Sequence, residues 1–260
     1  MKQIIRAEFL KVVYLRSNRA LLIVAALFGV LNTLATAFAL DSEVSSFGLP
    51  DTSTTLGVDA VYANTAASYV FALIVGILLF TGEYKHGTAI ATYLSVPKRS
   101  SVLIAKIVTG AIIGLVFQLV SFIASFASAY IYLGLKANSG EPSTDKWLNY
   151  FAAEALSGIV LGIVGISLGA LIKNQAIAVT GSLLWLFIVE GLLTAFLPDV
   201  GKFLLTGAIT GMLEIEVGPN DFNIDSSNYL TPMAATLLLI GYALIFMLIA
   251  TQTTLKRDIE

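Results

Sequence analysis

The sequence predicts an all-α integral membrane protein with six transmembrane helices and both termini in the cytosol. Of its 260 residues, 57% are hydrophobic and only 12% are charged, whereas soluble domains carry about a quarter charged residues. Six stretches are long and almost uncharged, and each approaches the roughly 20 residues that a helix needs to cross a bilayer. Because backbone polar groups in lipid must be paired within their own segment, we expect these stretches to be helical.

The six expected spans form one transmembrane domain that covers residues 1–260. Only the fourth and fifth spans contain a charged residue, Glu154 near the start of one and Glu190 inside the other. There is no cysteine, which excludes disulfides and thiolate metal sites. The spans are expected at 20–40, 60–81, 107–134, 151–172, 176–197 and 232–255.

The distribution of charge predicts the orientation. Twelve of the 15 lysines and arginines lie before the first span, between the second and third, between the fourth and fifth, or after the sixth. The other loops hold most of the acidic residues. Cytosolic loops of membrane proteins carry an excess of Lys and Arg, so we expect both termini and the loop between the second and third spans to be cytosolic.

The segment 1–19, before the first span, carries five cations. Ile5, Phe9, Val12 and Val13 fall close together on a helical wheel, which favours a helix that lies at the inner membrane interface. A positive flank that only sets the topology is the other interpretation.

The segment before the sixth span contains an apolar run that is too short to cross the bilayer. Residues 203–213 are apolar over only 11 positions, roughly half of the ~20 that a span requires. We therefore expect a re-entrant or interfacial segment on the outer side of the membrane.

The fourth span carries a stripe of small residues. Its glycines repeat every seven residues as two small-xxx-small pairs, the pattern that lets two helix backbones approach closely in lipid. We expect a helix–helix contact face, made either within the subunit or with a second copy. The glycines are Gly158, Gly162, Gly165 and Gly169.

Polar residues inside the spans are candidates for a translocation path. Gln118, Ser121 and Ser125 follow one face of the third span, and Asn32 lies in the first. They either line a polar cavity or form hydrogen bonds between helices. Glu190 is the one ionisable group expected well inside the membrane, where it is either a working acid or a hydrogen-bonded structural residue.

The cytosolic loop between the second and third spans predicts a short helix. Thr88 can cap a helix that covers residues 89–95. Pro97 then stops the helix, because proline lacks the backbone N–H that a helix interior uses. The two residues that follow, Lys98 and Arg99, would face lipid headgroups.

One face of this short helix is apolar and aromatic. Ile90, Tyr93 and Leu94 stand at positions i, i+3 and i+4, on one side of a helix. A loop that only sets topology needs cations alone. We therefore interpret the helix as a docking element for a cytosolic partner.

These residues resemble the ABC-2 type permease family, the membrane subunits of ATP-binding-cassette transporters. That family has six spans, a Glu-Tyr-basic-His/Asn-Gly-Thr segment after the second span, a Pro-basic-basic turn and a lysine near the start of the third span. The length, the orientation and the irregular segment before the sixth span also match, so the resemblance covers the whole chain. The matching residues are Glu83, Tyr84, Lys85, His86, Gly87, Thr88, Pro97, Lys98, Arg99 and Lys106.

The resemblance implies a multi-pass permease of the bacterial cytoplasmic membrane that dimerises, with itself or with a paralogous permease. It implies two separately encoded ATPase subunits, with the helix over 88–95 as the coupling helix seated in a cleft of the ATPase. The chain has no Gly-x-x-x-x-Gly-Lys-Ser/Thr loop to hold phosphates. We therefore expect no enzymatic activity and no cofactor of its own, with ATP and Mg²⁺ bound by the partner.

The expected activity is efflux, the usual direction in the family. A bundle lined by aromatic and serine residues, without basic residues at depth, favours a hydrophobic or amphipathic small molecule such as a drug, an antibiotic or a lipid-like compound. The alternative is a self-sufficient secondary transporter in which Glu190 carries protons or ions. A third interpretation, a scaffold subunit, gives no reason for the coupling-like loop. An intramembrane protease would need catalytic groups inside the membrane, whereas the one histidine, His86, is in the cytosolic loop.

Overall fold

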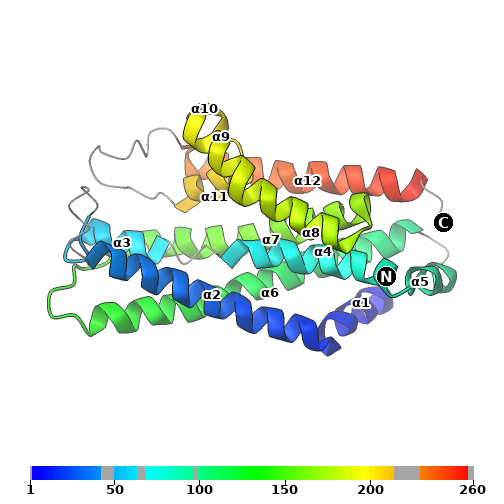
Figure 1. Cartoon of the computed structure of the whole chain (residues 1–260), viewed down its shortest axis with the longest axis horizontal. Coiled ribbons are helices and arrows are strands. Elements are labelled where there is room, and N and C mark those ends of the chain that lie inside the picture. The colour runs from blue at the N-terminus through cyan, green and yellow to red at the C-terminus, as the bar shows by residue number, and fades with distance from the viewer. Residues whose placement is uncertain (1, 42–49, 64–67, 97–98, 214–228, 257–260) are drawn as a thin grey trace.

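The computed structural model describes residues 2–41, 50–63, 68–96, 99–213 and 229–256, and this part of the chain forms helices without a β-strand. Most of the helices run along one long axis (Figure 1). The first six are α1 (Lys2–Tyr14), α2 (Arg16–Asp41), α3 (Thr55–Ala63), α4 (Tyr69–Lys85), α5 (Ala89–Ser95) and α6 (Arg99–Gly134). The others are α7 (Trp147–Ile172), α8 (Gln175–Leu184), α9 (Glu190–Phe196), α10 (Pro198–Gly201), α11 (Leu205–Leu213) and α12 (Pro232–Lys256).

Within the described residues, five helical stretches are long and apolar enough to cross a membrane. They correspond to α2, α6, α7, the continuous run from α8 to α9, and α12. In three of them, few residues of the most apolar 18-residue stretch are buried inside the protein: 22% of that stretch in α2, 22% in α8–α9 and 17% in α12. Large apolar side chains such as Leu31, Phe187 and Leu248 are more than half exposed. A soluble protein rarely exposes so much contiguous apolar surface, so the chain is an all-α, multi-pass membrane protein.

The expected second span, 60–81, is divided between two helices. The end of α3 and most of α4 cover it, and residues 64–67 lie outside the described part of the chain. The 17 residues of α4 alone fall short of the ~20 needed to cross the hydrocarbon core. A sixth crossing therefore stays a prediction.

The helix bounds differ from the expected segments at three places. The N-terminal helix ends at Tyr14 instead of residue 19, and α2 begins at Arg16 instead of residue 20. Helix α6 begins at Arg99, eight residues before the expected start of the third span. Charged residues mark where a helix leaves the hydrocarbon, but a charge does not end a helix, so α2 and α6 begin before the expected spans.

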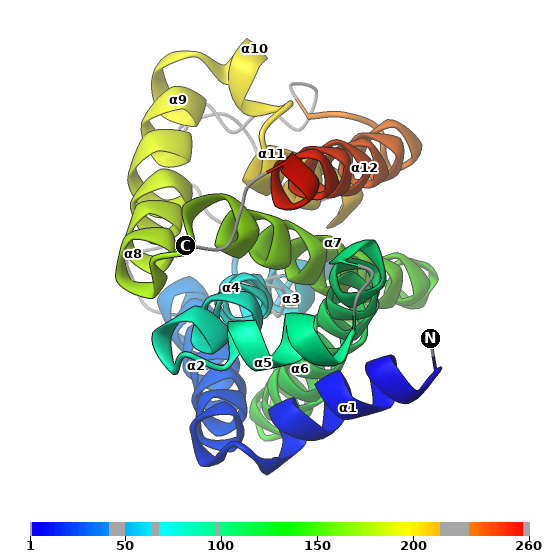
Figure 2. The ribbon, with the colours of Figure 1, turned by 90° about the vertical axis from the view of Figure 1, so that its right-hand side faces the viewer.

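Helix α7 lies at the centre of the bundle and packs against α4, α6 and α12 (Figure 2). The glycines of α7 allow its backbone to lie close to the backbones of α4 and α6 in the same chain. A Cβ added at Gly158 would lie 2.7 Å from the carbonyl oxygen of Gly114 in α6. A Cβ added at Gly165 would lie 3.0 Å from the Cα of Gly76 in α4. The stripe thus serves two partner helices, with Gly158 and Gly162 facing α6 and Gly165 and Gly169 facing α4.

The bundle has two distinct ends. Helices α1 and α5 lie at the same end as the C-terminal end of α12, which we call the α5 end (Figures 1 and 2). Helix α3 and the connection from α6 to α7 lie at the opposite end (Figure 1). Helix α11, the expected re-entrant or interfacial segment, is a short apolar helix that packs against α12 and α7.

Candidate functional site

The candidate site lies at the α5 end, where α4 stops and α5 begins. The chain reverses through Gly87, whose φ of +67° lies in the left-handed region. Two hydrogen bonds close the turn: the N–H of Gly87 donates to the carbonyl of Tyr84 (3.3 Å), and the N–H of Thr88 donates to that of Glu83 (2.9 Å). This is the Schellman arrangement, which places glycine one residue beyond the helix cap. The glycine of the Glu-Tyr-Lys-His-Gly-Thr motif therefore fixes how α5 leaves α4.

Thr88 precedes α5 as expected, but its side chain does not cap the helix. A capping residue normally has an extended backbone, so that its side chain can reach the second or third N–H of the helix. The turn holds Thr88 at φ −87° and ψ −8°, a helical conformation. Its hydroxyl instead lies 3.5 Å from the carbonyl of Glu83.

Helix α5 has one face toward the protein and one toward solvent. Ala89 is buried, and the hydroxyl of Thr92 lies 3.5 Å from Oε1 of Glu83. On the other side Ile90 is 57% exposed and Leu94 is 80% exposed. Among the other residues expected to dock, Pro97 and Lys98, with the side chains of Tyr93 and Arg99, lie outside the described part of the chain.

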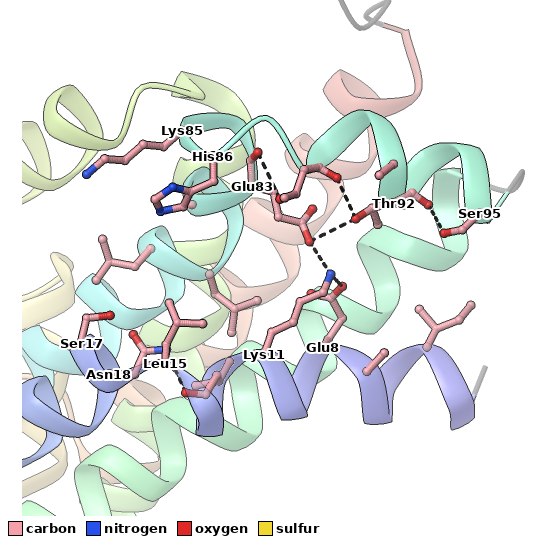
Figure 3. A pocket seen from close by; sticks show the side chains of 18 of the residues that line it. Glu8, Lys11, Leu15, Ser17, Asn18, Glu83, Lys85, His86, Thr92 and Ser95 are labelled. Atoms are coloured by element: carbon pink, nitrogen blue, oxygen red, sulfur yellow. Dashed lines mark hydrogen bonds and ion pairs between the residues drawn. The ribbon is translucent and has the colours of Figure 1, made fainter.

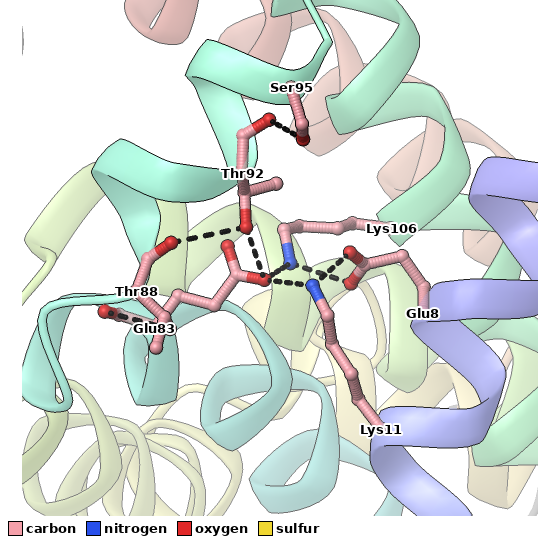
Figure 4. Close-up of polar contacts among 7 residues, drawn as sticks. All are labelled: Glu8, Lys11, Glu83, Thr88, Thr92, Ser95 and Lys106. Carbon is pink, nitrogen blue, oxygen red and sulfur yellow. Dashed lines mark hydrogen bonds and ion pairs between the residues drawn. The ribbon is translucent and has the colours of Figure 1, made fainter.

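Four charged side chains form an ion cluster beneath α5 (Figure 4). Nζ of Lys106 lies 2.7 Å from Glu8 and 2.9 Å from Glu83. Nζ of Lys11 lies 2.7 Å from Glu8 and 2.6 Å from Glu83. The Lys106 side chain is only 1% exposed, and the two carboxylates are 3% and 8% exposed. Two ammonium groups thus neutralise two carboxylates, and the cluster joins α1, α4 and α6 at one point.

The cluster shifts the pKa values of Glu83 and Lys11 toward their charged forms. Burial alone raises the pKa of Glu83, but the charges and hydrogen bonds of Lys106 and Lys11 outweigh it, so the pKa lies below its ordinary value. Burial alone lowers the pKa of Lys11, but the hydrogen bonds and charges of Glu8 and Glu83 more than offset it, so that pKa is raised. The ion pairs therefore stabilise the charged forms of Glu83 and Lys11.

Sequence reasoning placed Glu83 in the site and noted Lys106, but it did not find their pairing with α1. A usable signal was present. Glu8 is the one acidic residue among the first 40, and Glu83 is the one acidic residue between Asp59 and Glu141. An isolated acid in a basic, membrane-flanking segment has cations as its nearest partners. The buried face of α1 accordingly carries Glu8 and Val12, whereas Val13, expected on that face, is 45% exposed.

A groove of about 940 Å³ adjoins the cluster (Figure 3). Residues of α1, of the end of α4 and of α5 line it. Glu8, Lys11 and Glu83 line it together with Lys85 and His86 of the motif. Glu83, Lys85 and His86 of the motif therefore lie around the same groove. Of these three, Glu83 belongs to the ion cluster.

The polar residues expected along a translocation path lie in helix contacts. Gln118, Ser121 and Ser125 are completely buried. The Gln118 amide donates to the carboxylate of Glu154 in α7, and the Ser121 hydroxyl donates to the carbonyl of Ala25 in α2 (2.9 Å). This geometry favours interhelical hydrogen bonding, the second of the two interpretations. Asn32 lies on α2 and is partly buried.

Glu190 is buried and fully engaged. Its carboxylate accepts hydrogen bonds from the indole N–H of Trp185 (2.9 Å), the backbone N–H of Thr206 (2.9 Å) and the hydroxyl of Thr206 (2.6 Å). Thr206 lies in the first turn of α11, where unpaired N–H groups favour an anion. Glu190 therefore anchors α11 to α9. Glu154 in α7 is also buried, at 0% exposed.

Comparisons with known proteins give a distant relative. No family model matches the chain. A protein of Bacillus subtilis (strain 168), printed as "Uncharacterized protein YhcI", is 23% identical over 224 residues. The alignment covers 75% of this chain and 66% of that protein, so the chain spans just under two thirds of the relative's length. At this identity the comparison does not assign a family.

Proposed function

We propose that the chain is the permease subunit of an ATP-binding-cassette exporter of the ABC-2 type. The observation on which the proposal rests is that α5 exposes an apolar side at the end of the bundle. The helix sits at the end of the bundle on a glycine-dependent turn, and its outward side chains Ile90 and Leu94 are exposed and apolar. A helix with exposed apolar side chains along one side suits insertion into a cleft of a partner protein.

The contacts beneath α5 supply a mechanical connection. Thr92 contacts Glu83, and Glu83 is held by Lys11 of α1 and Lys106 of α6. The Schellman turn adds a backbone link to α4. A force applied to α5 by a moving ATPase would therefore reach three helices of the bundle at once.

The partners follow from the proposal. Two copies of the permease, or this chain and a paralogue, would form the path across the bacterial cytoplasmic membrane. Separate ATPase subunits would bind ATP and Mg²⁺. The cargo would be a hydrophobic or amphipathic small molecule. The alternative of a proton-driven transporter draws little support from Glu190, because three donors already hold its carboxylate against α11.

The test is assembly with an ATPase. The wild-type chain, purified from its native membrane, should bring with it a subunit that contains a phosphate-binding Gly-x-x-x-x-Gly-Lys-Ser/Thr loop, and the complex should hydrolyse ATP. The double variant Ile90→Asp and Leu94→Asp should lose both the subunit and the hydrolysis. Both side chains are exposed, so the fold should tolerate the change.

A control places one negative charge at an exposed leucine at the other end of the bundle. Leu135 follows α6 at that end and is 84% exposed. Leu135→Asp should retain the ATPase subunit. Retention of the subunit by the double variant, or transport by the purified chain alone in vesicles with an ion gradient, would overturn the proposal.

A further inference from the structure

The groove beside the ion cluster has apolar walls. Ile4 and Val12 of α1 line it together with Leu78 and Leu79 of α4. Its volume of about 940 Å³ is at the upper end of the range of roughly 300–1,000 Å³ that small-molecule sites occupy. The α1–α2 corner at Leu15 also lines the groove. An apolar groove of this size, at the end of a membrane-spanning bundle, suits a hydrocarbon chain.

The charge that the groove presents is positive. Glu8 and Glu83 also line it, but each lies against two ammonium groups, so the ion cluster of Glu8, Lys11, Glu83 and Lys106 has no net charge. What remains at the rim is the exposed pair of Lys85 and His86 at the end of α4 (Figure 3).

A second cation stands close to this rim. An adjoining pocket of about 770 Å³ shares Leu78, Lys85 and Gln175 with the groove. It adds Lys173, whose Nζ lies 5.4 Å from the centre of the Tyr84 ring. Lys85 and Lys173 therefore line one and the same pocket beside the groove, where an anionic group could meet both.

We propose that this groove binds an anionic phospholipid of the cytoplasmic leaflet, with an acyl chain along α1 and α4 and the headgroup phosphate at Lys85, His86 and Lys173. The apolar walls account for the chain, and the rim supplies the complementary charge. The cytoplasmic leaflet is rich in anionic lipids, and each nearby Lys or Arg strengthens the attraction about fivefold.

The bound lipid would also support α5. The groove-lining residues of α5 include Ala91, Thr92 and Ser95, which are small and share one side of the helix. Ile90 and Leu94 stand on the other side and are exposed. The lipid would thus fill the space behind α5 and hold its docking side outward. The binding itself does not depend on the proposed function.

The experiment measures lipid binding to the full chain without an ATPase. The purified chain in detergent is titrated with phosphatidylglycerol or with phosphatidylcholine of the same acyl chains, and native mass spectrometry counts the lipids retained. We expect one phosphatidylglycerol per chain, retained at least tenfold more tightly than phosphatidylcholine. Lys85→Gln should weaken it about fivefold. Ala91→Trp, which fills the groove, should abolish it.

A matched control removes one positive charge far from the groove. Lys202→Gln, at an exposed pair with Asp199, should bind the lipid as the wild type does. Equal retention of the two lipids, or unchanged binding in both Lys85→Gln and Ala91→Trp, would overturn the proposal. If Ala91→Trp fails to fold, Lys85→Gln decides alone. A chain that binds no lipid could still assemble with an ATPase, so this failure is separable from that of the proposed function.

Discussion

Glu83 connects more elements than its neighbours in the motif. Its backbone carbonyl closes the turn into α5, and its carboxylate binds Lys11, Lys106 and Thr92. Removing one partner of a buried ion pair leaves the other charges without compensation, which costs on the order of 3 kcal/mol. The side chain is 8% exposed, so water cannot replace the lost partner.

Glu83→Gln should therefore lower the apparent melting temperature at neutral pH. The folded pKa of Glu83 lies below its ordinary value of 4.5, so its stabilising contribution is present above about that pH and is lost as the pH falls through the folded value. The difference between wild type and variant should be largest at pH 7 and should shrink below pH 4.5. Thermal unfolding in one detergent at several pH values measures it.

Asp199→Asn is the matched control. Asp199 forms an ion pair with Lys202 at 3.0 Å, but its side chain is 88% exposed. Exposed pairs contribute little, because water screens them. This variant should melt within a degree or two of the wild type. A pH-independent gap between Glu83→Gln and wild type would show that the cluster does not stabilise through charge.

At the scale of the element, α7 depends on its glycines for its place between α4 and α6. A Cβ at Gly165 would lie 3.0 Å from Gly76 Cα and from Ile77 N. Both atoms are backbone, so neither moves without shifting α4. Gly165→Ala should destabilise the bundle by roughly 1–3 kcal/mol, the usual cost of overpacking, and lower the apparent melting temperature.

Gly181→Ala is the control for Gly165→Ala, because it makes the same substitution where no neighbour is close. Gly181 lies in α8, and a Cβ there would meet nothing within 4 Å. The substitution should be neutral or slightly stabilising, because alanine favours a helix over glycine by about 1 kcal/mol. Equal melting temperatures for the two alanine variants would remove the packing role of Gly165.

The element pattern was largely accessible from sequence. Hydropathy located α2, α6, α7, α8–α9 and α12, and the short helix over 89–95 emerged with the expected bounds. Hydropathy could not place helix ends in water, where Arg99 continues α6 as readily as an uncharged residue would. It also could not show which way a polar side chain points, so Gln118 was weighed for a pathway although it bonds to Glu154.

At the scale of the whole molecule, the orientation across the membrane is the first quantity to test. The chain has no cysteine, so single cysteines can be introduced without a background. Ser95 of α5 and Asn138 of the α6–α7 connection are both exposed and lie at opposite ends of the bundle. We expect a membrane-impermeant maleimide to label Asn138→Cys in intact cells, and Ser95→Cys only after the membrane is opened. The reverse pattern would place α5 outside the cell and exclude an ATPase partner there.

The candidate site shows the limit of sequence reasoning at this scale. Glu83 and Gly87 belong to the same short motif, so their closeness in space follows from their closeness in sequence. Glu8 and Lys106 are 98 residues apart, yet their side chains lie 2.7 Å from each other. Their meeting requires α1 to cross the end of the bundle, which no local pattern in residues 2–14 specifies.

The length of α6 sets how motion at one end is felt at the other. Its 36 residues make a rod of about 54 Å, some 24 Å longer than the hydrocarbon layer is thick. The helix therefore extends beyond the hydrocarbon layer, and α5 directly precedes its first residue. Turning a rod of that length by about 5° about the end farther from α5 would move α5 by roughly 5 Å. Small rotations deep in the bilayer would therefore become large excursions at the tip.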